Sequence, residues 1–226
     1  LAALEYYRSG NESLHISTRS SLGDEDEMPV PYLFRNLSEM PELEQRALDA
    51  ASGRILEVGC GVGSHLLALN NASATGIDTS SGSLEVARLR GVLNVQQSSW
   101  QCYEPEVKYD TVLALMNGLG LAGSLEKLPH FLIRLSSWLS SSGSILADSS
   151  DISYLFEEEE DGGIWMPATA YYGDLTYEIS FQGASENLEW LFVSFEQLRV
   201  CCNTIGLRCE KIFEGENQHY LARIYR

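Results

Sequence analysis

Three glycines stand at alternate positions behind a short apolar run, in the stretch Glu57-Val58-Gly59-Cys60-Gly61-Val62-Gly63. Glycine has no Cβ, so a chain with this spacing can turn tightly after a strand and bring its backbone close to a ligand. A helix is expected directly after the loop, and the free N–H groups of its first turn would face the same ligand. The dinucleotide-binding fingerprint has its third glycine where this chain has Ser64. The loop therefore predicts a ligand site, and a tight turn without a ligand is the alternative.

An aspartate ends the short run Gly76-Ile77-Asp78, 17 positions after Gly61. If this run is the second strand of a parallel sheet, its carboxylate faces the crevice beside the glycine loop. It could then accept hydrogen bonds from both hydroxyls of a ribose. An aspartate at a strand end is, taken alone, more often a turn or helix cap. Together with the loop, Asp78 predicts a ribose-containing ligand.

The elements that must position these residues alternate between strands and helices. Strands are expected at residues 54–58, 74–78, 92–97, 110–116 and 144–148, and helices at 41–51, 64–69, 83–90 and 124–139. Residues 171–181 and 190–193 then indicate the strands of a hairpin-like insertion, before a helix at 196–205 and strands at 208–213 and 219–225. This alternation predicts an α/β fold with a parallel sheet covered on both faces.

The glycine loop and Asp78 resemble motif I and the second-strand acid of class I S-adenosylmethionine-dependent methyltransferases. The resemblance covers about residues 40–226 and continues in Tyr109-Asp110-Thr111-Val112, Ser142-Gly143-Ser144-Ile145-Leu146, Phe195-Glu196-Gln197-Leu198 and Ile205-Gly206-Leu207. It implies a Rossmann-like, mostly parallel sheet of seven strands with an antiparallel last strand, and the β insertion would follow the fifth strand. It also implies methyl transfer from S-adenosylmethionine by direct displacement, with S-adenosylhomocysteine as the product.

The same resemblance implies the cofactor contacts. Its cofactor site consists of Glu57 near the methionine amine, Gly59, Cys60 and Gly61 in the loop, Asp78 and Thr79 at the ribose and adenine, and Met116 and Asn117 at the sulfonium side. More narrowly, Phe34-Arg35-Asn36 and Met116-Asn117-Gly118 resemble a bacterial subgroup without a settled substrate. Arg35 could meet the cofactor carboxylate through a bidentate pair, and a surface ion pair is the alternative.

The stretch after the third strand departs from the family pattern. Members usually have an acid there that binds the adenine amine, whereas this chain has Gln97-Ser98-Ser99-Trp100. Ser99 could accept that hydrogen bond more weakly, and Trp100 could stack on the adenine ring. Packing of Trp100 in the core is the alternative.

The acceptor site is expected outside the carboxyl ends of the strands. Side chains expected there are Asn117, Asp148 and Asp151, with Trp165, Tyr171 and Tyr172 from the insertion. We expect a single domain, residues 1–226, in which residues 1–40 and 152–194 act as a lid over the acceptor. Asp148 or Asp151 could act as a base, and either could equally cap a turn. An aromatic and acidic pocket would suit an amine, while packing of the aromatic rings onto the sheet is the alternative.

Charge and cysteine content limit the partners. With 32 acidic and 15 basic residues the formal net charge is −17, which argues against a nucleic-acid acceptor. The acidic runs at residues 24–27 and 157–161 are expected to be solvated loops. Five cysteines without a CxxC pair favour a reducing, cytoplasmic location, and no apolar run is long enough for a membrane span. No metal site is expected, because the histidines show no ligand spacing.

Two alternatives to a small-molecule methyltransferase remain open. An NAD-dependent oxidoreductase shares the glycine loop and the ribose acid, although the missing third glycine counts against it. A protein that binds S-adenosylmethionine without catalysis would have the same motifs. Neither the acceptor nor the oligomeric state follows from the sequence.

Overall fold

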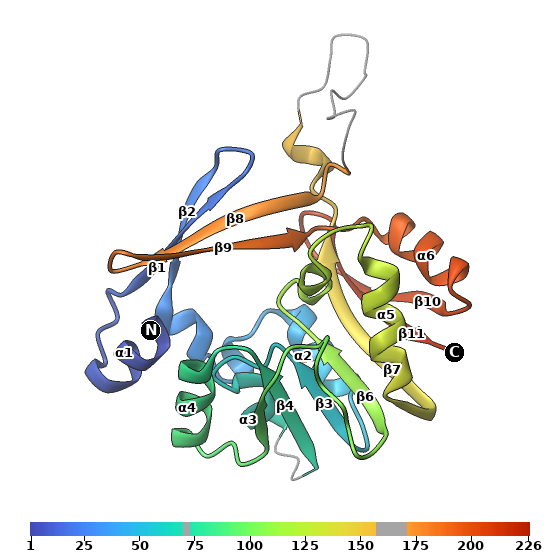
Figure 1. Cartoon of the computed structure of the whole chain (residues 1–226), viewed down its shortest axis with the longest axis horizontal. Helices are drawn as coiled ribbons and strands as arrows, with labels where there is room; N and C mark the ends of the chain where they lie inside the picture. The colour runs from blue at the N-terminus through green and yellow to red at the C-terminus, as the bar shows by residue number, and fades with distance from the viewer. Residues whose placement is uncertain (70–72, 157–170) are drawn as a thin grey trace.

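The computed structural model describes residues 1–69, 73–156 and 171–226, which form two β-sheets and their flanking helices (Figure 1). The larger sheet has seven strands in the order β10-β11-β7-β6-β3-β4-β5. Its strands are β3 (Ile55–Val58), β4 (Ala74–Asp78), β5 (Val95–Gln97), β6 (Tyr109–Ala114), β7 (Leu139–Ser150), β10 (Arg208–Glu214) and β11 (His219–Tyr225).

The pairing of these strands follows the predicted topology. Neighbours from β5 to β7 pair in parallel, whereas β11 is antiparallel to both β7 and β10. All four residues of β3 are buried, as expected for a strand in the middle of a sheet covered on both faces. The prediction of a mostly parallel seven-stranded sheet with an antiparallel last strand is confirmed.

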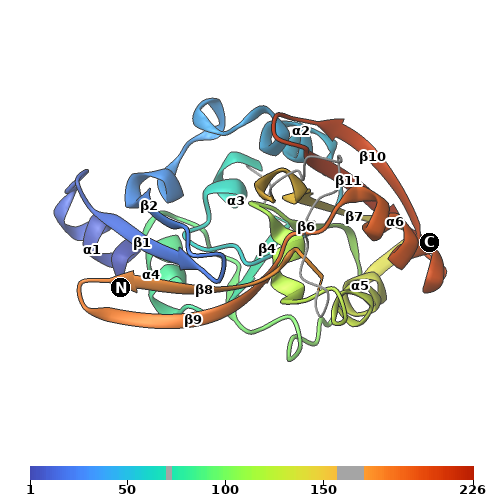
Figure 2. The ribbon, with the colours of Figure 1, turned by 90° about the horizontal axis from the view of Figure 1, so that it is seen from above.

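Helices cover both faces of this sheet, and Figure 2 shows α2 and α5 on opposite sides of it. The helices are α2 (Glu42–Ala50), α3 (Ser64–Leu69), α4 (Ser81–Leu89), α5 (Leu128–Ser137) and α6 (Phe195–Thr204). Phe131 of α5 and Leu198 of α6 lie in one core cluster, and Leu43 of α2 lies in the other. The helix expected at residues 124–139 is shorter than predicted and begins at Leu128, with Pro129 in its first turn.

A second sheet joins segments that lie far apart in the sequence. Its strands are β1 (His15–Ser20), β2 (Glu25–Pro29), β8 (Asp174–Phe181) and β9 (Ala184–Leu191), all antiparallel in the order β2-β1-β8-β9. The insertion hairpin is thus extended by an N-terminal hairpin that the sequence does not predict. The prediction of a loop at residues 24–27 is wrong, since Glu25, Asp26 and Glu27 belong to β2, although their side chains are exposed as expected. The other acidic run, residues 157–161, lies outside the described residues.

The second sheet lies over the carboxyl ends of the central strands (Figure 1). Near its end, β9 contacts the short 3-10 helix η3 (Gly118–Ala122) that follows β6. A Cβ at Gly120 would lie only 2.2 Å from the ring of Trp190, so only glycine leaves room for this indole. Helix α1 (Ala2–Ser9), which precedes β1, packs on α4. This arrangement places Trp190 beside the site described below.

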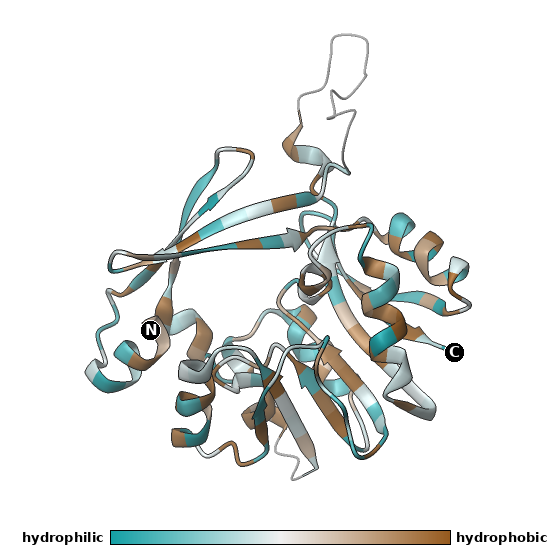
Figure 3. Cartoon of the chain, in the orientation of Figure 1, coloured by the Kyte–Doolittle hydropathy of each residue, from teal (hydrophilic) through white to brown (hydrophobic). Residues whose placement is uncertain are grey.

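Figure 3 shows where the hydrophobic residues lie along these elements: they concentrate in the central strands. None of the helices in residues 1–69, 73–156 and 171–226 combines the length and the apolar character needed to cross a bilayer. In the same ranges, no three His, Cys, Asp or Glu side chains are grouped as metal ligands would be.

Candidate cofactor and acceptor site

The glycine loop connects the end of β3 to α3 and is held against β4. Gly59 and Gly61 have φ angles of 78° and 51°, which glycine adopts without strain. The N–H groups of Gly59 and Cys60 donate to the carbonyl of Ile77 at 2.8 and 3.1 Å. The N–H of Gly61 donates to Oδ2 of Asp78 at 2.8 Å. The two sequence motifs are therefore in direct contact, and the aspartate fixes the loop.

The Asp78 carboxylate has capacity for further hydrogen bonds. Its Oδ1 accepts the N–H of Ser80 at 2.8 Å, so each oxygen takes one backbone donor. Each carboxylate oxygen can accept two hydrogen bonds, and Asp78 is only half-buried. The remaining lone pairs fit two ribose hydroxyls.

A cavity of about 280 Å³ opens beside the loop, at the carboxyl end of β3. It is lined by Leu33, Arg35, Glu57, Gly59, Cys60, Gly61, Val62, Ser64, His65, Ser83, Leu115, Met116, Leu121 and Trp190. The structure thus brings together six of the predicted cofactor residues, from Arg35 to Met116. Sequence reasoning missed the contributions of Leu33, Leu121 and Trp190, which tertiary contacts bring to the cavity.

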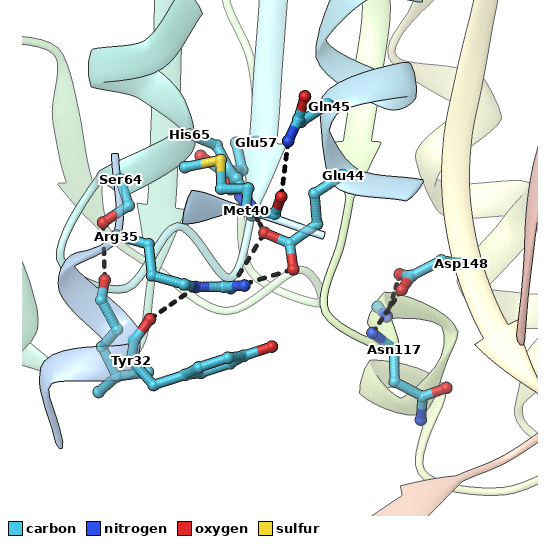
Figure 4. Close-up of polar contacts among 12 residues, drawn as sticks. Tyr32, Arg35, Met40, Glu44, Gln45, Glu57, Ser64, His65, Asn117 and Asp148 are labelled. Atoms are coloured by element: carbon cyan, nitrogen blue, oxygen red, sulfur yellow. Dashed lines mark hydrogen bonds and ion pairs between the residues drawn. The ribbon is translucent and has the colours of Figure 1, made fainter. Parts of the chain in front are cut away.

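Four charged side chains, Arg35, Glu44, His65 and Glu57, form a buried series of contacts (Figure 4). Three of them, Arg35, His65 and Glu57, line the cavity. The Nη2 of Arg35 donates to both carboxylate oxygens of Glu44 at 3.0 Å. The two ring nitrogens of His65 lie 2.9 Å from Oε2 of Glu44 and 2.6 Å from Oε1 of Glu57. All four residues are at most 9% exposed. The alternative of a surface ion pair for Arg35 is therefore wrong, because its partner is a buried glutamate from α2.

The imidazole of His65 is doubly protonated in this environment. Burial alone would lower the pKa of His65, but the charge of Glu57 and the hydrogen bonds to both glutamates outweigh it and raise the pKa to about 10. Burial would likewise raise the pKa of Glu44, yet His65 and Arg35 hold it below its usual value. The four groups therefore carry alternating charges, positive on Arg35 and His65 and negative on the glutamates.

Within this series of four charged side chains, two polar atoms have no hydrogen-bond partner among the described residues. They are Nη1 of Arg35 and Oε2 of Glu57. A buried donor and a buried acceptor without protein partners are costly unless a ligand or an ordered water satisfies them. Both belong to residues that line the cavity. A carboxylate would satisfy the guanidinium and an ammonium group would satisfy the glutamate, so the pair fits the amino-acid end of S-adenosylmethionine.

The residues expected at the adenine lie outside the cavity lining. Trp100 is 8% exposed, packs edge-on against Phe131 and donates its indole N–H to the carbonyl of Leu121 at 3.0 Å. This is the core packing that the sequence left open, and the stacking on adenine stays a prediction. Ser99 is half-buried, and Thr79 is exposed next to Asp78. Their contacts with the ligand also stay predictions.

The turn after β6 holds two non-glycine residues in the left-handed region. Met116 and Asn117 have φ angles of 63° and 58°, a conformation that costs about 1 kcal/mol or more for each residue. The fully buried Asp148 holds the turn, since its oxygens accept the N–H of Asn117 at 2.8 Å and of Gly118 at 2.9 Å. His219 contacts the same carboxylate at 2.9 Å through its Nε2. Asp148 is thus engaged as the cap of a turn, which is the alternative that the sequence left open for it.

The other residues predicted for the acceptor site follow β7 or precede β8. Asp151 accepts the hydroxyl of Tyr172 at 2.7 Å and the N–H of Ser153 at 2.9 Å. The ring of Tyr171 lies 4.4 Å from that of Tyr172, and its hydroxyl accepts the N–H of Ser194. Trp165 lies outside the described residues. Asp151 and the two tyrosines therefore form one cluster.

Comparisons with known proteins agree with this geometry. A family model for a methyltransferase domain matches residues 55–143. A crystal structure of an S-adenosylmethionine-dependent methyltransferase from Bacteroides fragilis, in complex with S-adenosyl-L-homocysteine, is 38% identical, with a TM-score of 0.90 over 99% of this chain and 92% of that one. No curated protein matches the chain.

Two more distant structures share the fold. The CcbJ methyltransferase from Streptomyces caelestis has a TM-score of 0.63 at 14% identity, over 84% of this chain and 92% of that one. CalS10, an amino pentose methyltransferase from Micromonospora echinaspora, has a TM-score of 0.54 at 14% identity, over 84% of this chain and 90% of that one. The matches favour methyl transfer over the NAD-dependent alternative. The chain belongs to the class I S-adenosylmethionine-dependent methyltransferases, and S-adenosylmethionine is its cofactor.

Proposed function

We propose that the protein transfers the methyl group of S-adenosylmethionine to a small molecule, by direct displacement at the sulfonium. The observation that carries the proposal is the cavity at the end of β3, whose lining residues include one unpartnered guanidinium nitrogen and one unpartnered carboxylate oxygen among the described residues. The cofactor supplies an activated methyl group when it is bound. The chain supplies alignment, which accounts for much of the rate in such a displacement.

Each predicted cofactor residue has a role in this proposal. Arg35 binds the carboxylate and Glu57 the ammonium group, while Gly59, Cys60 and Gly61 allow close approach. Asp78 binds the ribose with Thr79 beside it, Ser99 and Trp100 lie on the adenine side, and Met116 and Asn117 lie on the sulfonium side. Contacts already described support the roles of Arg35, Glu57 and Asp78 most directly.

The acceptor is a small amine or another partly cationic molecule in our proposal. The net charge of −17 disfavours nucleic acid, and the second sheet covers the carboxyl ends of the strands (Figure 1). Among the related folds, CalS10 is an amino pentose methyltransferase and KedS8, from Streptoalloteichus, a sugar N-methyltransferase. Residues 1–40 and the described residues of 152–194 act as the lid, and Asn117, Tyr171 and Tyr172 line the acceptor side.

A proton must leave an acceptor that begins as an ammonium group or a hydroxyl. Of the two predicted bases, Asp151 is the better placed, because Asp148 is fully buried and already accepts two backbone N–H groups.

All five cysteines are free. We therefore place the protein in the cytoplasm, where thiols stay reduced.

Calorimetric titration tests the cofactor assignment first. We expect micromolar binding of S-adenosylmethionine and S-adenosylhomocysteine and no binding of NAD. Incubation with a metabolite extract should then release S-adenosylhomocysteine. Binding without any release from fractionated extracts would identify a non-catalytic binding protein, and binding of NAD alone would overturn the proposal.

Substitution of Asp78 by alanine is expected to weaken the binding of S-adenosylhomocysteine about 30-fold. Two hydrogen bonds from ribose to a charged acceptor are lost, which corresponds to about 2 kcal/mol. Calorimetry measures the affinity, and Asp49→Ala, at an exposed position of α2, is the matched control. Unchanged affinity in Asp78→Ala would remove the ribose assignment.

A further inference from the structure

Glu44 and His65 occupy the space between the two residues that we assign to the amino-acid end of the cofactor. Glu44 connects Arg35 to Nε2 of His65, and Nδ1 of His65 connects to Glu57. The side chains of Glu44 and His65 are each only 6% exposed. Of the two, only His65 also lines the cavity.

The order of charges along this series of side chains is informative. A neutral imidazole has one N–H and could donate to only one carboxylate, so with both glutamates ionised the second contact requires the imidazolium. With His65 protonated, positive and negative groups alternate from Arg35 to Glu57. Glu44 lies between two positive neighbours, whereas Glu57 has one, His65. A zwitterionic amino-acid group would complete the alternation, with its carboxylate at Arg35 and its ammonium group at Glu57.

The free atoms at both ends are fixed by their other contacts. Arg35 donates its Nε to the carbonyl of Tyr32 at 2.8 Å, lies 3.6 Å above the Tyr32 ring and uses Nη2 for Glu44. Only Nη1 remains without a partner in the described part of the chain. Glu57 uses Oε1 for His65, which leaves Oε2. The positions of both free atoms therefore depend on Glu44 and His65.

We propose that Glu44 and His65 are positioning residues for the amino-acid end of S-adenosylmethionine, which hold Arg35 and Glu57 so that its carboxylate and ammonium group are recognised together. The inference rests on the proposed cofactor roles of Arg35 and Glu57. It gives a function to two residues that have no role in the proposed cofactor contacts. It also separates recognition of the amino-acid group from recognition of the nucleoside, which is assigned to Asp78.

The proposal is tested by calorimetry with two ligands, S-adenosylhomocysteine and 5′-methylthioadenosine. The second ligand keeps the nucleoside and the sulfur but lacks the amino-acid group. In His65→Gln we expect the affinity for S-adenosylhomocysteine to fall 10- to 100-fold, since hydrogen bonds to charged groups are lost or misaligned. The affinity for 5′-methylthioadenosine should stay within twofold of wild type. Glu42→Gln, at an exposed position of α2, is the matched control and should change neither affinity.

Glu44→Gln is the second variant, and it keeps the shape of the side chain if His65→Gln does not fold. It should show the same selective loss. An equal loss for both ligands, or no loss for either, would overturn the positioning role and leave the proposed function intact. If wild-type protein bound neither S-adenosylmethionine nor S-adenosylhomocysteine, the proposed function would itself fail, and that outcome is visible before any variant is made.

Discussion

Raising the pH from 7 to 9.5 is expected to lower the free energy of unfolding by about 3 kcal/mol through His65 alone. The folded protein holds the imidazolium with a pKa of about 10, against 6.5 for an unperturbed histidine. The folded state therefore binds one more proton than the unfolded state between these two values. Stability from this group is complete below about pH 6.5 and is lost as the pH rises through 10, at about 1.4 kcal/mol per pH unit where the difference is a full proton.

Urea unfolding at a series of pH values, followed by tryptophan fluorescence, measures this effect. Wild type and His65→Gln should differ in slope, with a steep decline only in wild type. Buried thiols add a smaller decline in both proteins, because burial raises the pKa of Cys60 above its usual value and only the unfolded thiol ionises near pH 9. Parallel pH profiles for the two proteins would show that His65 is not an imidazolium in the folded state.

The centre of the larger sheet could be predicted because strands such as β3 and β6 are apolar in themselves. The run from Tyr109 to Ala114 is buried at five of six positions, and such a run has few alternatives inside an α/β protein. The second sheet could not be predicted, since β1 and β2 are rich in serine, threonine and acids and contain only three apolar residues. Their strand conformation depends on pairing, which joins Ser17 of β1 to Ser180 of β8. Such contacts between distant segments leave no periodic signal in either segment.

The same division applies to the site. The glycine loop and Asp78 follow from local spacing, and the Gly61 N–H joins them in the structure. Arg35 could be predicted from the sequence as a cofactor residue, but its burial and its pairing with Glu44 could not. Arg35 lies before α2 and Glu44 lies within it. The sequence predicts Asp148 at the end of a central strand, whereas β7 continues two residues further, to Ser150. The contact of Asp148 with His219, 71 positions later, arises only because β11 pairs with β7.

The N-terminal segment is bound to the glycine loop by contacts other than that of Arg35. The Ser64 hydroxyl donates to the carbonyl of Leu33 at 2.6 Å. Arg90 donates to the carbonyl of Val62 at 2.9 Å and to that of Phe34 at 3.3 Å. This segment continues into β2 and so into the second sheet. A ligand at Arg35 would therefore also stabilise the attachment of the proposed lid, which connects cofactor binding to the geometry of the acceptor side.

Substitution of Arg35 by methionine is expected to have the largest effect on the cofactor site. The variant keeps much of the volume but removes the charge that neutralises Glu44, and loss of one partner from a buried ion pair costs about 3 kcal/mol or more of stability. It also removes the donor for the cofactor carboxylate, so we expect S-adenosylhomocysteine to bind about 100-fold more weakly. Binding of 5′-methylthioadenosine should change little, because the ribose contact is assigned to Asp78 and not to Arg35.

Arg46→Met is the matched control, since Arg46 lies on α2 in an exposed ion pair with Glu42. Such a pair contributes at most about 1 kcal/mol, so stability and affinity should stay close to wild type. Calorimetry and urea unfolding of both variants separate the two effects of Arg35. If Arg35→Met lost stability but kept its affinity for S-adenosylhomocysteine, Arg35 would serve only to attach the N-terminal segment. The free Nη1 would then need a different ligand, and the acceptor itself, if it carries an acidic group, would be the next molecule to test.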